Sequence, residues 1–170
     1  MRTEFEEFVR AGSTRLLRTA YLLTGDRLEA EDLLQMTLMR VARHWGAARA
    51  APGPYANRVL VNLSRDRARR ARRRVVETGW EELEVVPAQD DDLAEQIARR
   101  ALLIAALAQL PGRQREVLVL RFYADLSVED AAVATGASPG TVKSHTSRGL
   151  SRLRELLAES NPLEVSSDER

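Results

Sequence analysis

The run from residue 126 to residue 157 constrains the fold of this chain more than any other stretch. Ser127 is of a type that caps helix N-termini, and Asp130 follows three residues later as its capping-box partner. Gly136 can take the left-handed conformation that ends a helix, and Ser138, followed by proline, is a typical start for the next one. The spacing therefore predicts a helix on each side of a three-residue turn, as in a helix-turn-helix.

The second of these helices has one apolar face and one polar, basic face. The inward positions recur three or four residues apart and comprise Val142, Thr146, Gly149, Leu150, Leu153 and Leu157. The outward residues are of types that contact phosphates and base edges in DNA: Thr141, Lys143, Ser144, Ser147, Arg148 and Arg152. We expect Arg148 to read a base and Arg152 to contact a phosphate. An ordinary amphipathic hairpin with a solvated basic face has the same spacing, so the motif alone leaves both interpretations open.

Composition excludes several classes of protein. The chain of 170 residues is 44% hydrophobic and 30% charged, which is typical of one globular domain or two small ones. It contains no cysteine, which excludes disulfides, thiolate zinc sites and a cysteine nucleophile, and a reducing cytoplasm is the simplest location. The longest strongly apolar run, residues 101–108, is too short to cross a bilayer, so we expect no membrane insertion.

Motifs of catalysis and cofactor binding are absent from the sequence. It has two histidines and contains no GxxxxGK[ST], GxGxxG or HExxH pattern. We therefore expect no enzymatic activity, no cofactor, no metal and no small-molecule substrate.

Charge divides the chain into parts, although the formal net charge is only +1. Residues 1–74 carry 16 basic and 8 acidic groups, whereas residues 75–96 carry eight acids and no base. We expect a first domain at 1–74, a flexible acidic linker at 75–94, a second domain at 95–158 and a disordered tail at 159–170.

Apolar residues recur at helical spacing almost throughout, and no strand pair is indicated. We expect a first helix that ends at the Gly25-Asp26 turn. Further helices are expected at about 28–45, 55–73, 93–110 and 113–123, with a loop at 46–54. The fold class is therefore all-α, with two small helical domains. Seven arginines between residues 65 and 74 cannot face a core, and a nucleic-acid grip and a solvated basic tail both explain them.

Three motifs, in this order, resemble those of the bacterial RNA polymerase sigma factors of the extracytoplasmic-function (ECF) type in the sigma-70 family. AEDLLQ (30–35) resembles the motif of the helix that docks on the polymerase clamp. YANRVLVNLSRDRARR (55–70) is similar to the helix that opens and reads the −10 element. The segment from LPGRQREV to RLREL (110–156) resembles the −35-binding domain.

The resemblance implies a sigma region 2-like domain at 1–74 and a helix-turn-helix, sigma region 4-like domain at 95–158. Such a chain binds core RNA polymerase through its clamp and flap regions, recognises the −10 and −35 promoter elements and enables transcription initiation. Its partners are core polymerase and promoter DNA, and the resemblance leaves an anti-sigma factor open.

Each site can then be assigned residues. The resemblance implies polymerase contacts at Asp32, Leu34, Gln35, Met36 and Met39. The −10 contacts are expected at Trp45, Tyr55, Arg58, Asn62, Arg65 and Arg69, although core packing is a slightly better explanation of Trp45 and Tyr55. The −35 contacts are the six outward residues of the recognition helix. Because His145 and Ser147 depart from the residues common in the family, the target sequence at −35 is not carried over.

Two other functions remain compatible with the residues alone. A stand-alone helix-turn-helix regulator would bind duplex DNA as a dimer through the same motif. A basic adaptor would use residues 55–74 to hold RNA.

Overall fold

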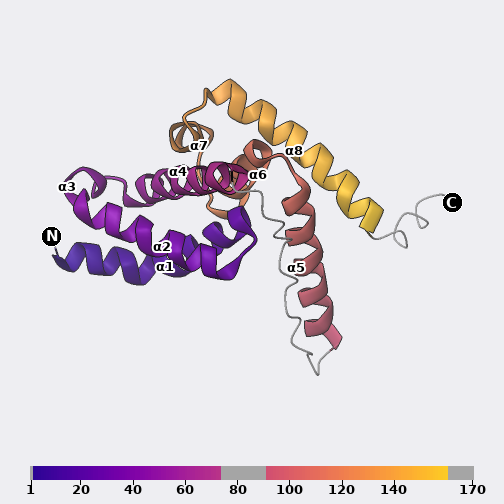
Figure 1. Ribbon diagram of the computed structural model, residues 1–170, viewed down its shortest axis with the longest axis horizontal. Coiled ribbons are helices and arrows are strands. Elements are labelled where there is room, and N and C mark those ends of the chain that lie inside the picture. The colour runs from indigo at the N-terminus through magenta and orange to yellow at the C-terminus, as the bar shows by residue number, and fades with distance from the viewer. Residues whose placement is uncertain (1, 74–90, 161–170) are drawn as a thin grey trace.

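The computed structural model describes residues 2–73 and 91–160, and every regular element in these two parts is a helix (Figure 1). The elements are α1 (Arg2–Thr24), α2 (Arg27–Arg43), α3 (Trp45–Ala48), α4 (Pro52–Arg73), α5 (Asp91–Gln109), α6 (Gly112–Leu118), the π-helical turn η1 (Val119–Tyr123), α7 (Val128–Thr135) and α8 (Pro139–Ser160). The predicted all-α fold class is confirmed.

Local signals set the boundary between the first two helices at the predicted turn. Gly25 has φ +75°, in the left-handed region that glycine adopts without strain. Its amide donates to the Tyr21 carbonyl at 2.7 Å, which closes α1. Asp26 then caps α2, because its Oδ1 accepts a hydrogen bond of 2.6 Å from the Glu29 amide.

Some predicted boundaries were wrong by a few residues. The expected loop at 46–54 contains most of the short helix α3, and α4 begins at Pro52 rather than at Tyr55. Proline suits the first turn of a helix, because its missing amide would have no partner there.

The expected linker and tail also overlap with helices at their ends. Residues 91–94 of the expected linker form the first turn of α5, and residues 159–160 of the expected tail belong to α8. The rest of the linker (75–90) and of the tail (161–170) lies outside the described residues.

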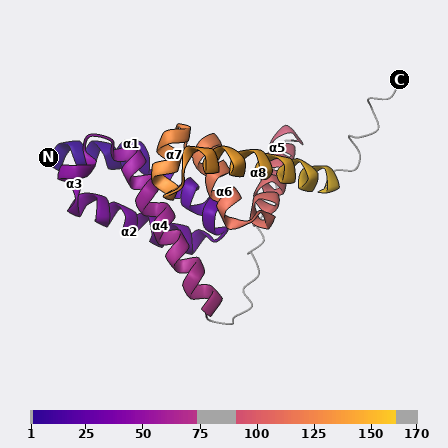
Figure 2. The same cartoon turned by 90° about the horizontal axis from the view of Figure 1, so that it is seen from above.

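In the first half of the chain, α1 packs along α2, and α4 crosses both (Figures 1 and 2). A cluster at the far end of this bundle consists of Leu16, Val41, Trp45, Ala48 and Ala56. Partly buried residues at the start of α1 and α4 pack against it. This cluster closes the end of the bundle that lies away from the second half of the chain.

In the second half, α6 and α8 pack together, with α5 against α8. Their cluster contains Leu107, Leu110, Leu118 and Leu156. The helix expected at 113–123 changes to π-helix at Val119, and the Ala124 amide donates to the Val119 carbonyl at 2.9 Å. A wider turn at this point ends the helix before the helix-turn-helix begins.

The two halves share one hydrophobic core. The largest cluster combines Leu33, Leu60 and Val61 from the first half with Leu120 and Val142 from the second. Helix α4 lies against α7, as both views show (Figures 1 and 2). The charge pattern predicts two domains, but nothing in it indicates that they pack on one another.

Candidate nucleic-acid interface

The helix-turn-helix has the geometry that its caps predict. Ser127 Oγ accepts a hydrogen bond of 2.9 Å from the Asp130 amide, and the two side chains also bond at 2.8 Å. Gly136 has φ +65°, and Ser138 Oγ accepts from the Thr141 amide at 3.1 Å. The turn between α7 and the recognition helix, α8, is therefore determined by residues of the helix-turn-helix itself.

Helix α8 presents the predicted outward face. Its side chains at Thr141, Lys143, Ser144, Ser147, Arg148 and Arg152 are all exposed. On the inward side Val142 and Gly149 are buried as expected, whereas Leu156 is buried more deeply than Leu157. Arg152 Nη1 lies 2.9 Å from Glu155 Oε2, and this hydrogen bond raises the pKa of Arg152, which stays charged.

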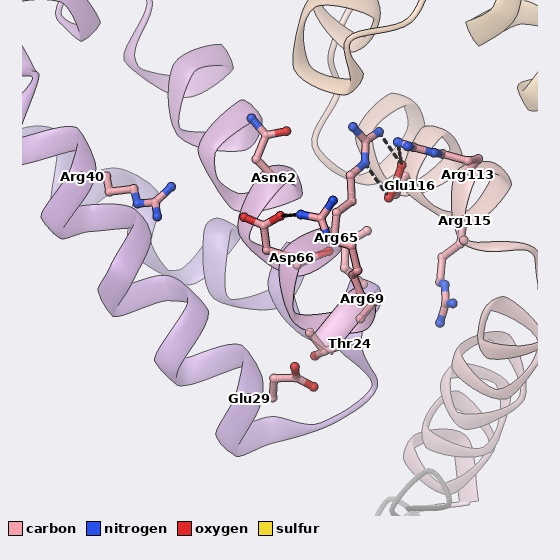
Figure 3. A pocket seen from close by; sticks show the side chains of 14 residues that line it. Thr24, Glu29, Arg40, Asn62, Arg65, Asp66, Arg69, Arg113, Arg115 and Glu116 are labelled. Atoms are coloured by element: carbon pink, nitrogen blue, oxygen red, sulfur yellow. Dashed lines mark hydrogen bonds and ion pairs between the residues drawn. The ribbon is translucent and has the colours of Figure 1, made fainter. Parts of the chain in front are cut away.

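The expected −10 residues of α4 differ in exposure. Arg58, Asn62 and Arg69 are exposed, and Arg69 pairs with Asp66 one turn away. Asn62, Arg65 and Arg69 line an open cavity of about 1150 Å³ between α4, α2 and α6 (Figure 3).

Arg65 points out of α4 toward α6 and is largely buried, with 21% of its side chain exposed. Its Nε and Nη2 donate to the two carboxylate oxygens of Glu116 at 2.9 and 2.6 Å. Its Nη1 donates to the Thr135 carbonyl at the end of α7, at 2.7 Å. Arg113 Nη1 is a second donor to Glu116, at 3.3 Å (Figure 3). A residue expected to contact DNA is therefore held by the other half of the chain.

Trp45 and Tyr55 are placed as core residues. Trp45 is 7% exposed, and its ring centroid lies 5.3 Å from that of Phe5 and 5.7 Å from that of Phe8. Tyr55 packs partly buried against the same cluster. Of the two interpretations that the sequence left open, the packing supports the core for both, and the buried Trp45 offers no exposed ring for a base to stack on.

The expected polymerase-binding residues lie on α2 and divide into two groups. Gln35 and Met39 are exposed, Met39 to 72%. Asp32 is half exposed and forms an ion pair with Arg67 of α4. Leu34 and Met36 are partly buried. Leu34 packs against the cluster at the far end of the bundle and Met36 against the core shared by the two halves, so they support this face rather than form its surface.

Several charged groups near the cavity were not predicted as part of a site. Arg40 and Glu29 of α2 line it together with Arg113 and Arg115 of α6 (Figure 3). Burial lowers the pKa of Arg115, and Glu116 partly opposes that shift. Burial also raises the pKa of Glu29, against the attraction of Arg67. The sequence shows these residues, but only the packing of α2, α4 and α6 brings them together.

Residues 2–73 and 91–160 contain no group of three or more His, Cys, Asp or Glu side chains that could hold a metal ion. None of the described helices is both long and apolar enough to span a membrane.

Two family models match the chain, and they occur along it in the same order as the three sequence motifs. Residues 8–74 match Sigma-70 region 2, and residues 100–153 match Sigma-70, region 4. The RNA polymerase sigma-E factor of Streptomyces avermitilis is 43% identical over 169 residues, which cover 98% of this chain and 92% of the relative. The ECF RNA polymerase sigma factor SigM of Mycobacterium tuberculosis is 30% identical, covering 92% of this chain and 78% of the relative.

A solved structure has the same fold. The sigma factor RpoE from Bartonella quintana, in complex with the anti-sigma factor NepR, is similar with a TM-score of 0.67 and 28% identity, covering 90% of this chain and 96% of that one. Sequence motifs, helix-turn-helix geometry and both sets of relatives agree, and the chain belongs to the ECF group of the sigma-70 family of RNA polymerase sigma factors.

Proposed function

We propose that this chain is a promoter-specificity subunit, which binds core RNA polymerase, recognises the −10 and −35 elements and enables transcription initiation. The observation that carries the proposal is the exposed polar and basic face of α8 in a correctly capped helix-turn-helix, within the segment that matches Sigma-70, region 4. An ordinary amphipathic hairpin does not explain why residues 8–74 of the same chain match Sigma-70 region 2.

The −35 element is read by α8 in the major groove. Arg148 reaches a base edge, since arginine forms bidentate hydrogen bonds with guanine. Lys143, Ser144 and Ser147 lie on the same exposed face, and Arg152 contacts phosphate.

The −10 element is opened and read by α4. Arg58 and Asn62 are four residues apart and so share a helix face, which supports Asn62 as a reader of an unstacked base. Arg65 and Arg69 grip the adjacent backbone. Trp45 is left out of this set, because its ring is buried.

Core polymerase is bound through its clamp by the exposed part of α2, at Asp32, Gln35 and Met39, and through its flap by the second domain. Leu34 and Met36 hold this face in place from beneath. The proposed domains are 1–74 and 95–158, which the matches at 8–74 and 100–153 support.

The chain acts in the cytoplasm as a regulatory subunit and performs no catalysis itself. It needs no cofactor or small-molecule substrate. An anti-sigma factor is a further partner, by analogy with the Bartonella quintana protein, which was solved with one.

Reconstituted transcription with core polymerase tests the proposal. The purified chain should direct transcription from specific promoters in a genomic library, while binding duplex promoter DNA weakly on its own. A stand-alone dimeric regulator would instead bind a palindrome tightly without polymerase and would give no polymerase-dependent transcript.

A further inference from the structure

Arg67 lies on the opposite side of α4 from the residues proposed to read the −10 element. Successive residues of a helix are about 100° apart, so Arg67 projects about 180° from Arg58 and about 140° from Asn62. It continues instead the inward stripe of Leu60 and Leu63, which are 0% and 4% exposed. One arginine of the basic run in α4 is therefore directed toward α2, against which α4 packs.

The Arg67 guanidinium group lies across one face of α2. Its Nη2 forms an ion pair with Asp32 Oδ2 and donates to Met36 Sδ at 3.7 Å. Its Nη1 donates to the Glu29 carbonyl at 3.4 Å and lies 4.0 Å from Glu29 Oε1. Glu29, Asp32 and Met36 follow one another at intervals of three and four residues, so a single side chain spans two turns of α2.

The contact with Asp32 fixes a carboxylate on the proposed docking face of α2. Gln35 and Met39 of this face are exposed, and the side chain of Asp32 is 54% exposed. A partner that binds a freely rotating carboxylate must first order it, and this ordering weakens the binding. Arg67 orders the carboxylate within the chain, since it holds Asp32 through Oδ2 while more than half of that side chain stays exposed.

We propose that Arg67 is a positioning residue for polymerase docking, which holds the Asp32 carboxylate in the orientation that core polymerase binds, and that it is not one of the arginines that grip DNA. The proposal rests on the function proposed above, in which Asp32 contacts the clamp. It adds a residue of the DNA-reading helix α4 to the polymerase-binding site on α2.

A double-mutant cycle tests whether Arg67 acts through Asp32. The affinity of the labelled full-length chain for core polymerase is measured by fluorescence titration without DNA. Arg67→Gln should weaken binding by about fivefold, the effect of having to order one side chain at an interface. Asp32→Ala should weaken it by about tenfold. If Arg67 acts through Asp32, the double variant should bind as Asp32→Ala does, whereas independent effects would multiply to about fiftyfold.

The matched control is Arg27→Gln. It also removes one arginine charge, and it breaks the exposed ion pair of 3.0 Å between Arg27 and Glu31 on α2. Its core affinity should equal that of the wild type. Equal losses in Arg27→Gln and Arg67→Gln would overturn the proposal, because the lost charge alone would explain them. If Arg67→Gln loses its helical circular dichroism, Arg67→Met takes its place in the cycle, since methionine packs like the arginine stem.

Transcription at saturating core polymerase separates docking from a grip on DNA. Once all of the chain is bound, Arg67→Gln should give the same yield of promoter-specific transcript as the wild type. Promoter binding should also keep the same slope of log affinity against log salt. A DNA contact at Arg67 would instead lower the yield at saturation and reduce that slope by about one, and either result would overturn the proposal.

The outcomes distinguish this proposal from the proposed function. Unchanged or tighter core binding by Arg67→Gln, or multiplied losses in the double variant, would overturn the role of Arg67 while the wild-type chain still directs transcription. Unchanged core binding by Asp32→Ala would do the same, because Arg67 would then have no docking residue to act through. A wild-type chain that does not bind core polymerase would overturn the proposed function, and the role of Arg67 with it.

Discussion

Gly149 of the recognition helix lies directly against Leu118 of α6. A Cβ atom added at Gly149 would be 3.1 Å from Leu118 Cδ1, 3.2 Å from Leu118 Cγ and 3.3 Å from Gln114 Cβ. Leu118 is itself buried, at 3% exposure. The close approach of α8 to α6 therefore requires glycine at this position, although glycine weakens a helix.

Gly149→Ala should reduce the stability of the protein. Alanine gains about 1 kcal/mol in helix propensity, but overpacking a closed site costs about 1–3 kcal/mol. Because Leu118 Cγ and Gln114 Cβ are not the free ends of side chains, they cannot move aside easily. We expect a net loss of about 1 kcal/mol in the free energy of urea unfolding.

Gly140→Ala, in the first turn of the same helix, is the matched control for this prediction. A Cβ there would meet only Ser138 Oγ, at 3.9 Å. This variant should be as stable as the wild type or slightly more so. If Gly149→Ala unfolds at the same urea concentration as Gly140→Ala, the contact with Leu118 is not a tight one.

The cap of α2 gives a second prediction of stability. Asp26 Oδ1 accepts from the Glu29 amide at 2.6 Å, so Asp26→Ala leaves that amide without its side-chain acceptor. The loss should be about 1 kcal/mol in thermal or urea unfolding. Asp26→Ser keeps a capping oxygen and should recover most of it, whereas an equal loss in both variants would indicate that the cap contributes little.

Local features of this fold were predictable from the sequence because near neighbours decide them. Ser127, Gly136 and Ser138 each act on groups within four residues, and the structure has them in the expected conformations. The outward face of α8 follows from helical periodicity, and its six residues are exposed as predicted. The exposed face of α8 was therefore predictable from the sequence, while its contacts with the −35 element stay a prediction.

Long-range packing was not predictable in the same way. Arg65 and Glu116 are 51 residues apart, and nothing in either local segment indicates that they meet. The exposure of a basic residue on α4 depends on whether the second half of the chain covers it. Trp45 illustrates the same limit, because its burial depends on Phe5 and Phe8 of another helix. The −10 part of the site could be assigned by residue type but not by accessibility.

Docking on core polymerase should depend on the exposed residues of α2. Gln35→Ala combined with Met39→Ala removes an amide and a large apolar side chain from this face, and core affinity should fall about fivefold or more. Asp32 is left unchanged in this variant, since its ion pair with Arg67 joins α2 to α4. A fluorescence titration of labelled protein with core polymerase measures the change.

Leu28→Ala is the matched control for docking. Leu28 is also 72% exposed on α2 but lies outside the proposed set. It should leave core affinity unaltered, and both variants should keep the helical content of the wild type. Equal affinity of the double variant and the control would place the docking surface elsewhere.

The last prediction distinguishes the α8 residue that contacts a base from the one that contacts a phosphate. Arg148→Ala should cost about 1–3 kcal/mol in promoter binding by the polymerase complex and should relax discrimination at one −35 position. Arg152→Ala should instead weaken binding to all promoters alike and lower the slope of log affinity against log salt by about one. The loss of Arg152 also leaves Glu155 without its ion-pair partner, which lies 2.9 Å away. The unpaired Glu155 carboxylate then repels DNA phosphate whatever the sequence.

Affinities across a library of single −35 substitutions, at two salt concentrations, separate these patterns. A uniform loss for Arg148→Ala would make that residue a phosphate contact and would leave base reading to Lys143, Ser144 or Ser147, its neighbours on the exposed face.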